Sequence, residues 1–299
     1  GRVFAMQRTP SYTLPAHNRP LDEEDQRRVK SDYAAFRRRA RTTVPGAFTD
    51  SLDSSALELS PEEREAEYRR HYDYGSPMRF AFTFTDIVVS EEANATAREF
   101  VSARIAERVG DPELAKRMIP TGYHLATRRL CIDTGYYETF RQENVELVDL
   151  LEDPIVEITE RGIRTAGREI EVDMIVLATG FDAVTGTLRR IDIRGTRGTL
   201  AEAWAAGAHA YLGLQVPGFP NLFLVTGPQS PAVLSNMVVS IEQHVEWIGD
   251  FLEYLREKGA TSFDPDPEAQ RAWVERVAEV ADSTLLREAD SWYTGNNIP

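Results

Sequence analysis

The chain has 299 residues, of which 42% are hydrophobic, and it carries a formal net charge of −14 at pH 7. This length allows one large domain or two, and the composition is ordinary for a globular protein. The acidic balance argues against nucleic-acid binding, which requires a basic face, and no apolar run approaches the roughly 18 residues that a membrane span needs.

The first part of the chain is predicted to be a short strand at residues 2–6, followed by a long helical block. Between about residues 20 and 120 the sequence is strongly charged, and apolar residues recur at helical spacing. Such positions include Val29, Tyr33, Phe36 and Ala40. Ser60-Pro61-Glu62-Glu63 has the pattern of a capped helix start, and Asp111-Pro112-Glu113 repeats it more weakly. We expect residues 16–125 to form a helical insertion.

From residue 145 onward the period changes from helical to β. Short β-type runs are Val145–Leu150, Ile155–Thr159, Gly162–Thr165 and Glu169–Val172. Ala166-Gly167 predicts a tight turn between the last two of them. Met174–Thr179 follows as an apolar run without polar alternation, which predicts a strand covered on both faces. Gly180 at its end allows a positive φ and a close approach of backbone to a ligand.

The last part of the chain is predicted to mix short strands with two long helices. Ile191–Ile193 and Leu222–Thr226 are the strand candidates. Apolar residues from Ile241 to Leu255 mark one face of a long helix that Gly259 closes, and another helix covers roughly 267–281. The order of strand, helical block, strands and helices predicts a discontinuous α/β fold with an inserted helical unit.

Two arginine-containing pairs are candidates for binding anionic groups. Arg8-Thr9 follows a predicted strand, where a guanidinium suits the 2′-phosphate of NADP and the Thr hydroxyl adds a contact. Arg128-Arg129 precedes another β-type run and could bind anionic cofactor groups or stabilise an anionic intermediate. From the local sequence alone, solvated surface arginines are the favoured explanation of both pairs.

Two further candidates lie near the end of the chain. Gly227-Pro228 precedes Asn236, and the free amides at the helix start after Asn236 attract negative charge, although a plain strand–loop–helix connection accounts for the same residues. Trp292 could line a pocket, or it could be an ordinary core or surface aromatic residue. Cys131 is the single cysteine, which is typical of a reducing compartment, so we expect a cytoplasmic protein. The scattered histidines predict no metal site.

No Gly-x-Gly-x-x-Gly occurs in the sequence, although a dinucleotide-binding chain is expected to contain such a phosphate loop. Either the nucleotide interpretation is wrong, or the loops lie upstream of Gly1. The first and last residues, Gly1 and Pro299, do not look like natural termini, so we expect a fragment.

An ordered series of short motifs closely resembles the type I Baeyer–Villiger monooxygenases, of the cyclohexanone and phenylacetone monooxygenase kind. The series covers nearly the whole chain, and the helical stretch matches only loosely. It consists of Gln7-Arg8-Thr9-Pro10, Arg128-Arg129 before Tyr136-Tyr137-Glu138, Val176 to Gly186, Ile191 to Gly195, Tyr211-Leu212-Gly213, Gly218-Phe219-Pro220-Asn221, Ser240 to Trp247, and Ser291-Trp292-Tyr293.

The resemblance implies an FAD- and NADPH-dependent enzyme that inserts an oxygen atom from O2 beside a ketone carbonyl, giving an ester or lactone. It implies a flavoprotein fold with two dinucleotide-binding (Rossmann-like) domains, incomplete at the N-terminus. Residues 1–15 and 126–175 would belong to the NADP-binding domain, and 176–299 would be the C-terminal part of the FAD-binding domain. We expect no nucleic-acid or membrane partner.

The resemblance also implies roles for individual residues. Arg129 matches the arginine that stabilises the anionic flavin peroxide and helps to position NADP, and Arg128 stands where the family often has a lysine near the 2′-phosphate of NADP. Arg8 and Thr9 match the residues that select NADPH. The remaining cofactor contacts would be Thr179, Gly180, Phe181, Asp182, Gly227, Pro228, Asn236, Met237 and Trp292. A variable substrate-pocket loop would comprise Ser230, Pro231, Ala232, Val233 and Leu234.

The chain also departs from the family pattern. Both phosphate loops and the His- and Trp-containing fingerprint between them are missing, which predicts that the chain alone is inactive. An N- or S-oxygenating flavin monooxygenase and a non-catalytic remnant or binding module stay open as alternatives. The identity of the ketone and the oligomeric state are not predicted.

Overall fold

The structure is a computed structural model that describes residues 1–47, 51–230 and 235–295. Two parallel strand pairs join the beginning of the chain to its middle. β1 (Val3–Gln7) pairs with β4 (Val145–Asp149), and β2 (Thr13–Pro15) pairs with β3 (Cys131–Asp133). Parallel pairing of segments more than 100 residues apart confirms the predicted discontinuous α/β organisation, with the helices between them forming one excursion of the chain.

The helical excursion forms the larger hydrophobic core. It contains α3 (Pro61–Tyr74), α4 (Pro77–Ala81), α5 (Glu91–Val109) and α6 (Pro112–Met118), with α7 (Tyr136–Thr139) packed beside α5. Tyr68, Phe80, Phe84 and Phe100 form an aromatic cluster within it, and Leu14 of β2 belongs to the same core. Both predicted helix starts are confirmed. Ser60 and Glu63 form a capping box on α3, and Asp111 caps α6.

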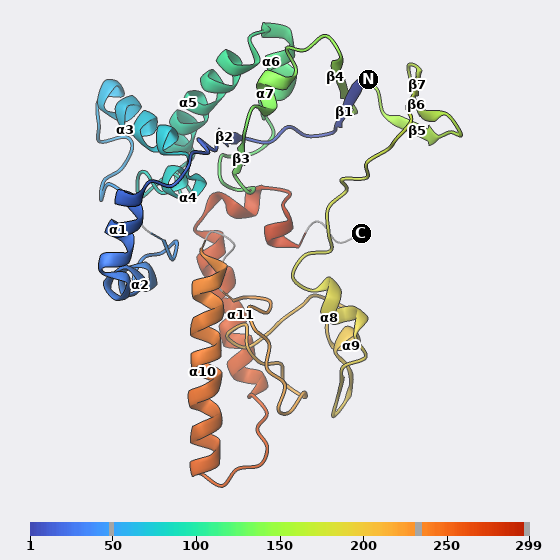
Figure 1. The fold of residues 1–299 in the computed structure, drawn as a ribbon. Helices are drawn as coiled ribbons and strands as arrows, with labels where there is room; N and C mark the ends of the chain where they lie inside the picture. The colour runs from blue at the N-terminus through green and yellow to red at the C-terminus, as the bar shows by residue number, and fades with distance from the viewer. Residues whose placement is uncertain (48–50, 231–234, 296–299) are drawn as a thin grey trace.

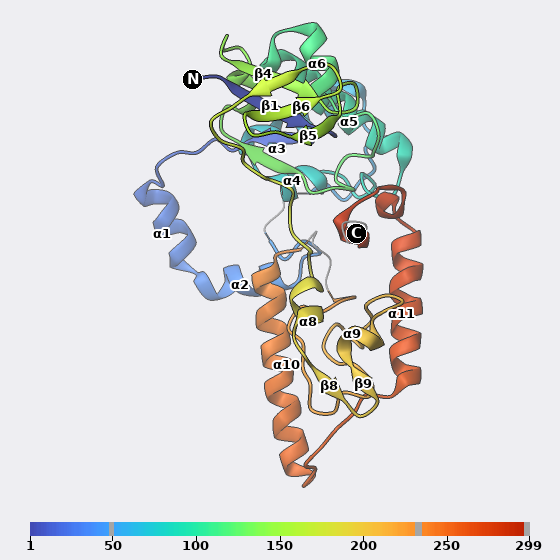
Figure 2. The same ribbon diagram turned by 90° about the vertical axis from the view of Figure 1, so that its right-hand side faces the viewer.

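Two short helices leave this body, and the second of them contacts a long helix of the C-terminal region. α1 (Glu23–Ser31) and α2 (Tyr33–Arg41) break at Asp32, whose side chain caps α2. Arg41 on α2 forms a double hydrogen bond, of 3.0 and 2.7 Å, with Glu246 on α10 (Met237–Glu257). Figure 2 shows α1 and α2 reaching down toward the upper end of α10.

A small antiparallel sheet follows β4 and confirms the predicted β-runs and their turn. It consists of β5 (Ile155–Ile158), β6 (Gly162–Thr165) and β7 (Glu169–Glu171). After β7 the chain runs down one side of the molecule as a single extended segment to α8 (Gly186–Arg190) (Figure 1). We call residues 174–182 the crossover segment.

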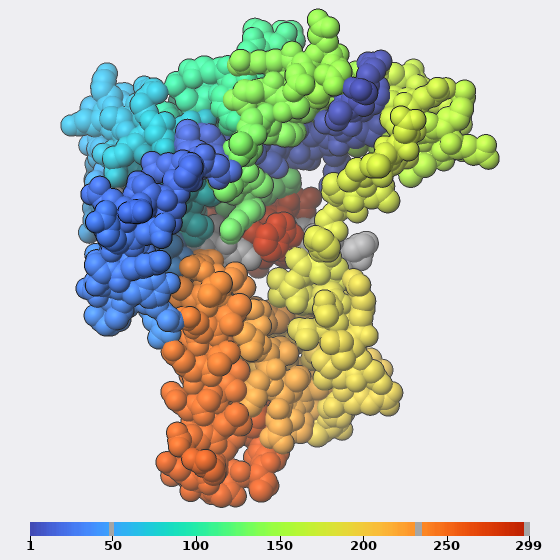
Figure 3. Space-filling view, in the orientation of Figure 1, coloured from blue at the N-terminus to red at the C-terminus, as the bar shows by residue number. Residues whose placement is uncertain are grey.

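The C-terminal region has a second, smaller core around Leu200 and Trp204. It contains the hairpin β8 (Arg194–Gly195) and β9 (Gly198–Thr199), α9 (Leu200–Ala203), α10 and α11 (Pro267–Asp282). Both predicted long helices are confirmed. The chain then returns to the first body through η1 (Leu285–Glu288) and η2 (Trp292–Thr294), where the Leu285 amide donates to the Val88 carbonyl at 2.9 Å. Figure 3 shows the red C-terminal segment in a hollow between the two bodies.

Three strand predictions are wrong. Met174–Thr179 forms no strand, and the side chains of Met174 and Val176 are each 78% exposed. A strand needs a neighbour for its backbone groups, and no described segment pairs with this one. In Ile191–Ile193, the amides of Ile191 and Ile193 donate to carbonyls only two or three residues away, as in a turn. In Leu222–Thr226, only the Leu224 amide donates to the backbone of a distant segment, at the Leu214 carbonyl, so no strand ladder forms.

Candidate functional site

A cleft of about 1440 Å³ opens beside β1, β7 and the start of the crossover segment. Four of the predicted site residues line it: Arg8, Thr9, Arg128 and Thr179. Arg8 and Thr9 are exposed directly after the carboxyl end of β1, which is where ligands bind in open α/β sheets. The structure therefore brings together residues that are up to 171 positions apart in the sequence, from Arg8 to Thr179.

The loop that carries Arg128 is fixed to the helical core by a buried asparagine. Asn94 on α5 donates to the Leu125 carbonyl at 2.9 Å and accepts from the Leu125 amide at 3.0 Å. Arg128 then lies with its guanidinium 4.6 Å from the centre of the Tyr123 ring. Its Nε is buried and has no hydrogen-bond partner in the described structure. A buried N–H without a partner favours an anionic ligand at this place.

Arg129 belongs to a different neighbourhood. It is not among the residues that line the cleft, and its guanidinium lies beside the Tyr293 hydroxyl on η2. Burial raises the pKa of Tyr293, and the positive charge of Arg129 opposes part of that rise. Trp292 packs edge-on against Tyr293, with ring centroids 4.6 Å apart. Arg129 and Trp292 therefore flank the same tyrosine.

A tight loop precedes α10. The Gly227 amide donates to the Gly213 carbonyl at 3.0 Å, and a Cβ on Gly227 would lie 2.7 Å from that carbonyl oxygen, so only glycine fits. Asn236 caps α10, because its side chain accepts a hydrogen bond from the Val238 amide at 3.1 Å. Ser230 follows the loop against Gly213. Pro231, Ala232, Val233 and Leu234 lie outside the described residues.

The far end of the crossover segment is open. Gly180 has a φ of +88°, as its position predicts, and no atom lies within 4 Å of where its Cβ would be. Phe181 is 93% exposed, and the Oδ2 of Asp182 lies 4.0 Å from the Nη2 of Arg190. The structure does not bring Gly180, Phe181 and Asp182 to the cleft, whose lining ends at Thr179.

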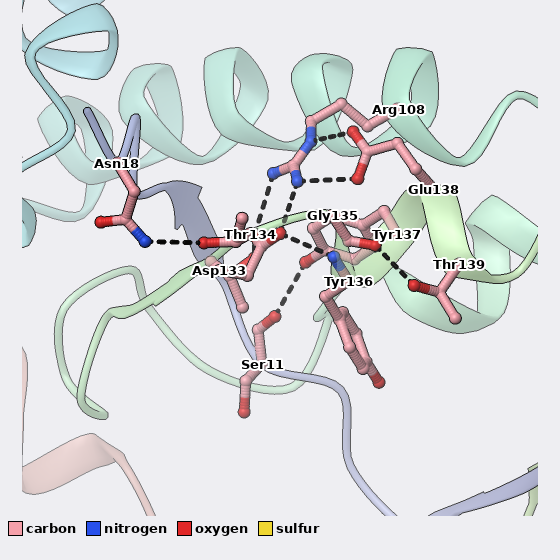
Figure 4. Close-up of polar contacts among 11 residues, drawn as sticks. Ser11, Asn18, Arg108, Asp133, Thr134, Gly135, Tyr136, Tyr137, Glu138 and Thr139 are labelled. Atoms are coloured by element: carbon pink, nitrogen blue, oxygen red, sulfur yellow. Dashed lines mark hydrogen bonds and ion pairs between the residues drawn. The ribbon is translucent and has the colours of Figure 1, made fainter. Parts of the chain in front are cut away.

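The most elaborate polar cluster was not predicted from the sequence. Arg108 on α5 donates two hydrogen bonds to Asp133, of 3.0 and 2.6 Å, and two to Glu138, of 2.7 and 3.0 Å (Figure 4). Burial raises the pKa of Asp133, but the bonds from Arg108, Thr13 and the Tyr136 amide outweigh burial and hold it below its usual range. The bond from Arg108 also lowers the pKa of Glu138. Asp133 and Glu138 follow Arg108 by 25 and 30 positions, and no sequence-spacing rule predicts a contact over such separations.

The described residues offer neither a membrane-spanning helix nor a metal-binding cluster. None of the helices there combines the length and the apolar character that crossing a bilayer requires. No group of three or more His, Cys, Asp or Glu side chains in those ranges could hold a metal ion.

The chain is similar to known monooxygenases along nearly all of its length. Cyclohexanone 1,2-monooxygenase of an Acinetobacter species is 40% identical over 303 residues, which cover 99% of this chain and 54% of that protein. A Baeyer–Villiger monooxygenase of Pseudooceanicola batsensis is 38% identical over 99% of this chain and 54% of its own length. No family model matches.

Solved structures show the same fold. The crystal structure of OTEMO in complex with FAD and NADP superposes with a TM-score of 0.93 at 35% identity, covering 97% of this chain and 55% of that chain. The fold is therefore that of the two-dinucleotide-binding-domain flavoproteins. The chain spans about half the length of the curated relatives it matches. Over the half that it spans, the chain resembles the Baeyer–Villiger monooxygenases in both sequence and fold.

Proposed function

We propose that this chain supplies the NADP-binding region and the C-terminal part of an FAD- and NADPH-dependent Baeyer–Villiger monooxygenase, which converts a ketone and O2 into an ester or lactone. The observation that carries the proposal is the cleft in which Arg8, Thr9 and Arg128 lie together after the carboxyl end of a strand. Homology along 99% of the chain supports it. We further propose a cytoplasmic location, which the single cysteine suits.

The residues present fit the two cofactors. The unpartnered Nε of Arg128 and the exposed guanidinium of Arg8 suit a phosphate of NADP. The open space at Gly180, the Gly227-Pro228 loop and the start of α10 after Asn236, at Met237, would hold part of FAD. FAD and NADPH, when bound, supply hydride transfer and oxygen activation. The protein contributes binding, orientation and charge.

Arg129 is the residue that we propose to be catalytic. Its positive charge favours negative charge developing near it, and the hydroxyl of Tyr293, which packs against Trp292, lies beside its guanidinium. In the proposed domain arrangement, residues 1–15 and 126–175 form the NADP-binding part, 16–125 the helical insertion, and 176–299 the FAD-binding part. Ser230 to Leu234 would border the ketone.

The test is turnover by the complete enzyme that contains this chain. With NADPH, O2 and cyclohexanone we expect formation of the ring-expanded lactone, a cyclic ester, coupled to NADPH oxidation. Arg129→Ala should lower that rate by roughly 100-fold or more, the loss typical of removing a charge-stabilising group, while the circular dichroism spectrum stays unchanged. Arg129→Lys, which keeps the charge, should lose less. Full ester formation by Arg129→Ala would refute the role.

The same assay separates the alternatives. An enzyme that oxygenates an amine or a sulfide but no ketone would be the N- or S-oxygenating kind. Absence of NADPH oxidation in the complete protein, with both cofactors bound, would instead indicate a non-catalytic binding module.

A further inference from the structure

We propose that His244 is a positioning residue that holds the Gly227-Pro228 loop in place from α10. The inference rests on the proposed function in so far as that loop faces a cofactor. His244 lies seven residues into α10, about two turns from the helix start that Asn236 caps. It therefore connects the loop to the same helix end that the proposed function places near the flavin.

The contact is short and buried. His244 is 2% exposed, and its Nδ1 lies 2.9 Å from the backbone nitrogen of Thr226. A backbone N–H can only donate, so Nδ1 must carry no proton and the ring must be neutral with its proton on Nε2. Burial lowers the pKa of His244, which favours the neutral ring that this bond needs.

The loop that His244 holds contains two non-glycine residues with a strained backbone conformation. Thr226 has a φ of +53° and Gln229 a φ of +59°, in the left-handed region that residues other than glycine rarely adopt. Such conformations cost free energy, so surrounding contacts must maintain them. The bond from the Thr226 amide to His244 acts directly at the first of the two strained positions.

Other hydrogen bonds hold the same loop from parts of the chain outside α10. The Gln229 side chain accepts from the Ala210 amide at 3.0 Å, and the Gln229 carbonyl accepts from the Trp273 indole on α11 at 3.1 Å. Gly227 adds its bond to the Gly213 carbonyl. Among these anchors, only the His244 bond ties the loop to α10. Loss of this bond should free the loop from α10 while the contacts on its other side remain.

The test compares three replacements of His244. Asparagine places its Oδ1 where Nδ1 lies, so His244→Asn keeps the acceptor. His244→Gln places its acceptor near the position of Nε2, and His244→Ala has none. We would measure hydrogen exchange at the Thr226 amide in the 299-residue chain, with the Val238 amide at the Asn236 cap as an internal reference.

We expect His244→Ala and His244→Gln to speed exchange at Thr226 by about tenfold or more, as the loss of a hydrogen bond implies. His244→Asn should stay within a few-fold of the wild type, and exchange at Val238 should not change in any variant. Equal exchange at Thr226 in His244→Asn and His244→Ala would overturn the positioning role, because the acceptor would then make no difference.

A second readout uses the complete enzyme. We expect His244→Ala to lower kcat while KM for NADPH stays unchanged, since the Arg8 cleft is separate from the loop, and His244→Asn to restore kcat. An unchanged kcat in a variant with fast Thr226 exchange would overturn the link between the loop and catalysis. If the wild-type enzyme does not turn over ketones, the proposed function fails, and the exchange measurement still decides whether His244 positions the loop.

Discussion

The arginines of this chain differ in whether their charge is paired with a carboxylate of the protein. The Arg108 guanidinium forms ion pairs with two carboxylates, those of Asp133 and Glu138. Arg8 lines the cleft and makes no ion pair within the described residues, and the Arg128 Nε has no partner there. The first arrangement stabilises a fold and the second leaves charge for a ligand. This contrast separates structural arginines from candidate binding residues, which the sequence alone does not do.

Arg8 is predicted to select NADPH over NADH. In the complete enzyme, Arg8→Ala should raise KM for NADPH by roughly tenfold to 100-fold, because a charge-assisted hydrogen bond contributes about 1.5–3 kcal/mol. KM for NADH, which lacks the 2′-phosphate, should change little. Arg2→Ala is the matched control, since Arg2 lines the same cleft but pairs with Glu146 at 3.0 Å. Equal changes for both cofactors would show that Arg8 does not contact the 2′-phosphate.

The Arg108 cluster is predicted to make stability depend on acid pH. Asp133 and Glu138 have lowered pKa values in the folded chain. Their contribution is therefore present above their unfolded values of about 4 and is lost as the pH falls through the folded values. Arg108→Ala should cost about 3 kcal/mol at pH 7, because it leaves two carboxylates without their ion-pair partner, and the Asp133 side chain is only 9% exposed. The variant should also show a weaker dependence of the free energy of unfolding on pH below pH 5.

Urea unfolding at several pH values would measure both effects. The control is Arg69→Ala, whose exposed pair with Glu65 should contribute less than about 1 kcal/mol. An acid profile of Arg108→Ala that matches the wild type would contradict the assignment.

Between elements, α2 and α10 are held together by exposed charges. Arg37 and Arg41 on α2 bond to Glu242 and Glu246 on α10, and bonding to Arg41 lowers the pKa of Glu246. Each of these four side chains is more than a third exposed, so dissolved salt screens the attraction between the opposite charges. We infer that these exposed ion pairs contribute to holding α2 against α10.

The attachment should weaken with salt and with charge reversal. Arg41→Glu should speed hydrogen exchange in α2 about twofold to fivefold at low ionic strength, as the loss of an exposed pair implies. The double variant Arg41→Glu with Glu246→Arg should restore slow exchange. In the wild type, 0.5 M salt should mimic the single variant, because the screening length falls below about 5 Å. Exchange in α2 that ignores both changes would mean that apolar packing holds the helices.

The accuracy of the sequence predictions follows the range of the interactions involved. Helix starts were predicted correctly because the Ser60–Glu63 capping box is local chemistry within four residues. The crossover segment was predicted wrongly as a strand, because strand formation depends on a neighbour that apolar residues alone do not identify. Arg8, Thr9 and Arg128 were chosen by motif, and the structure places them in one cleft, while their roles stay predictions. His244 and Arg108 were missed, since their partners are far away in the sequence.

For the whole molecule, the crossover segment is the largest inconsistency between sequence and environment. Its residues are strongly apolar, yet Met174, Val176 and Leu177 are 78%, 78% and 72% exposed. Soluble chains rarely leave such runs uncovered. The relatives are nearly twice as long as this chain. We infer that the crossover segment contacts polypeptide which the relatives have and the 299 residues do not include.

This inference predicts that the 299-residue chain alone binds little FAD. Gel filtration of the purified chain should give far less than one flavin per chain, and adding the remaining half of the enzyme as a separate polypeptide should restore binding. Val176→Asp should leave the unfolding of the isolated chain within about 0.5 kcal/mol of the wild type, since the side chain is already exposed, but it should block reconstitution. Val156→Asp, at an exposed position on β5, is the control and should reconstitute normally. Stoichiometric yellow flavin in the isolated chain would contradict the prediction, as would reconstitution of Val176→Asp at the wild-type level.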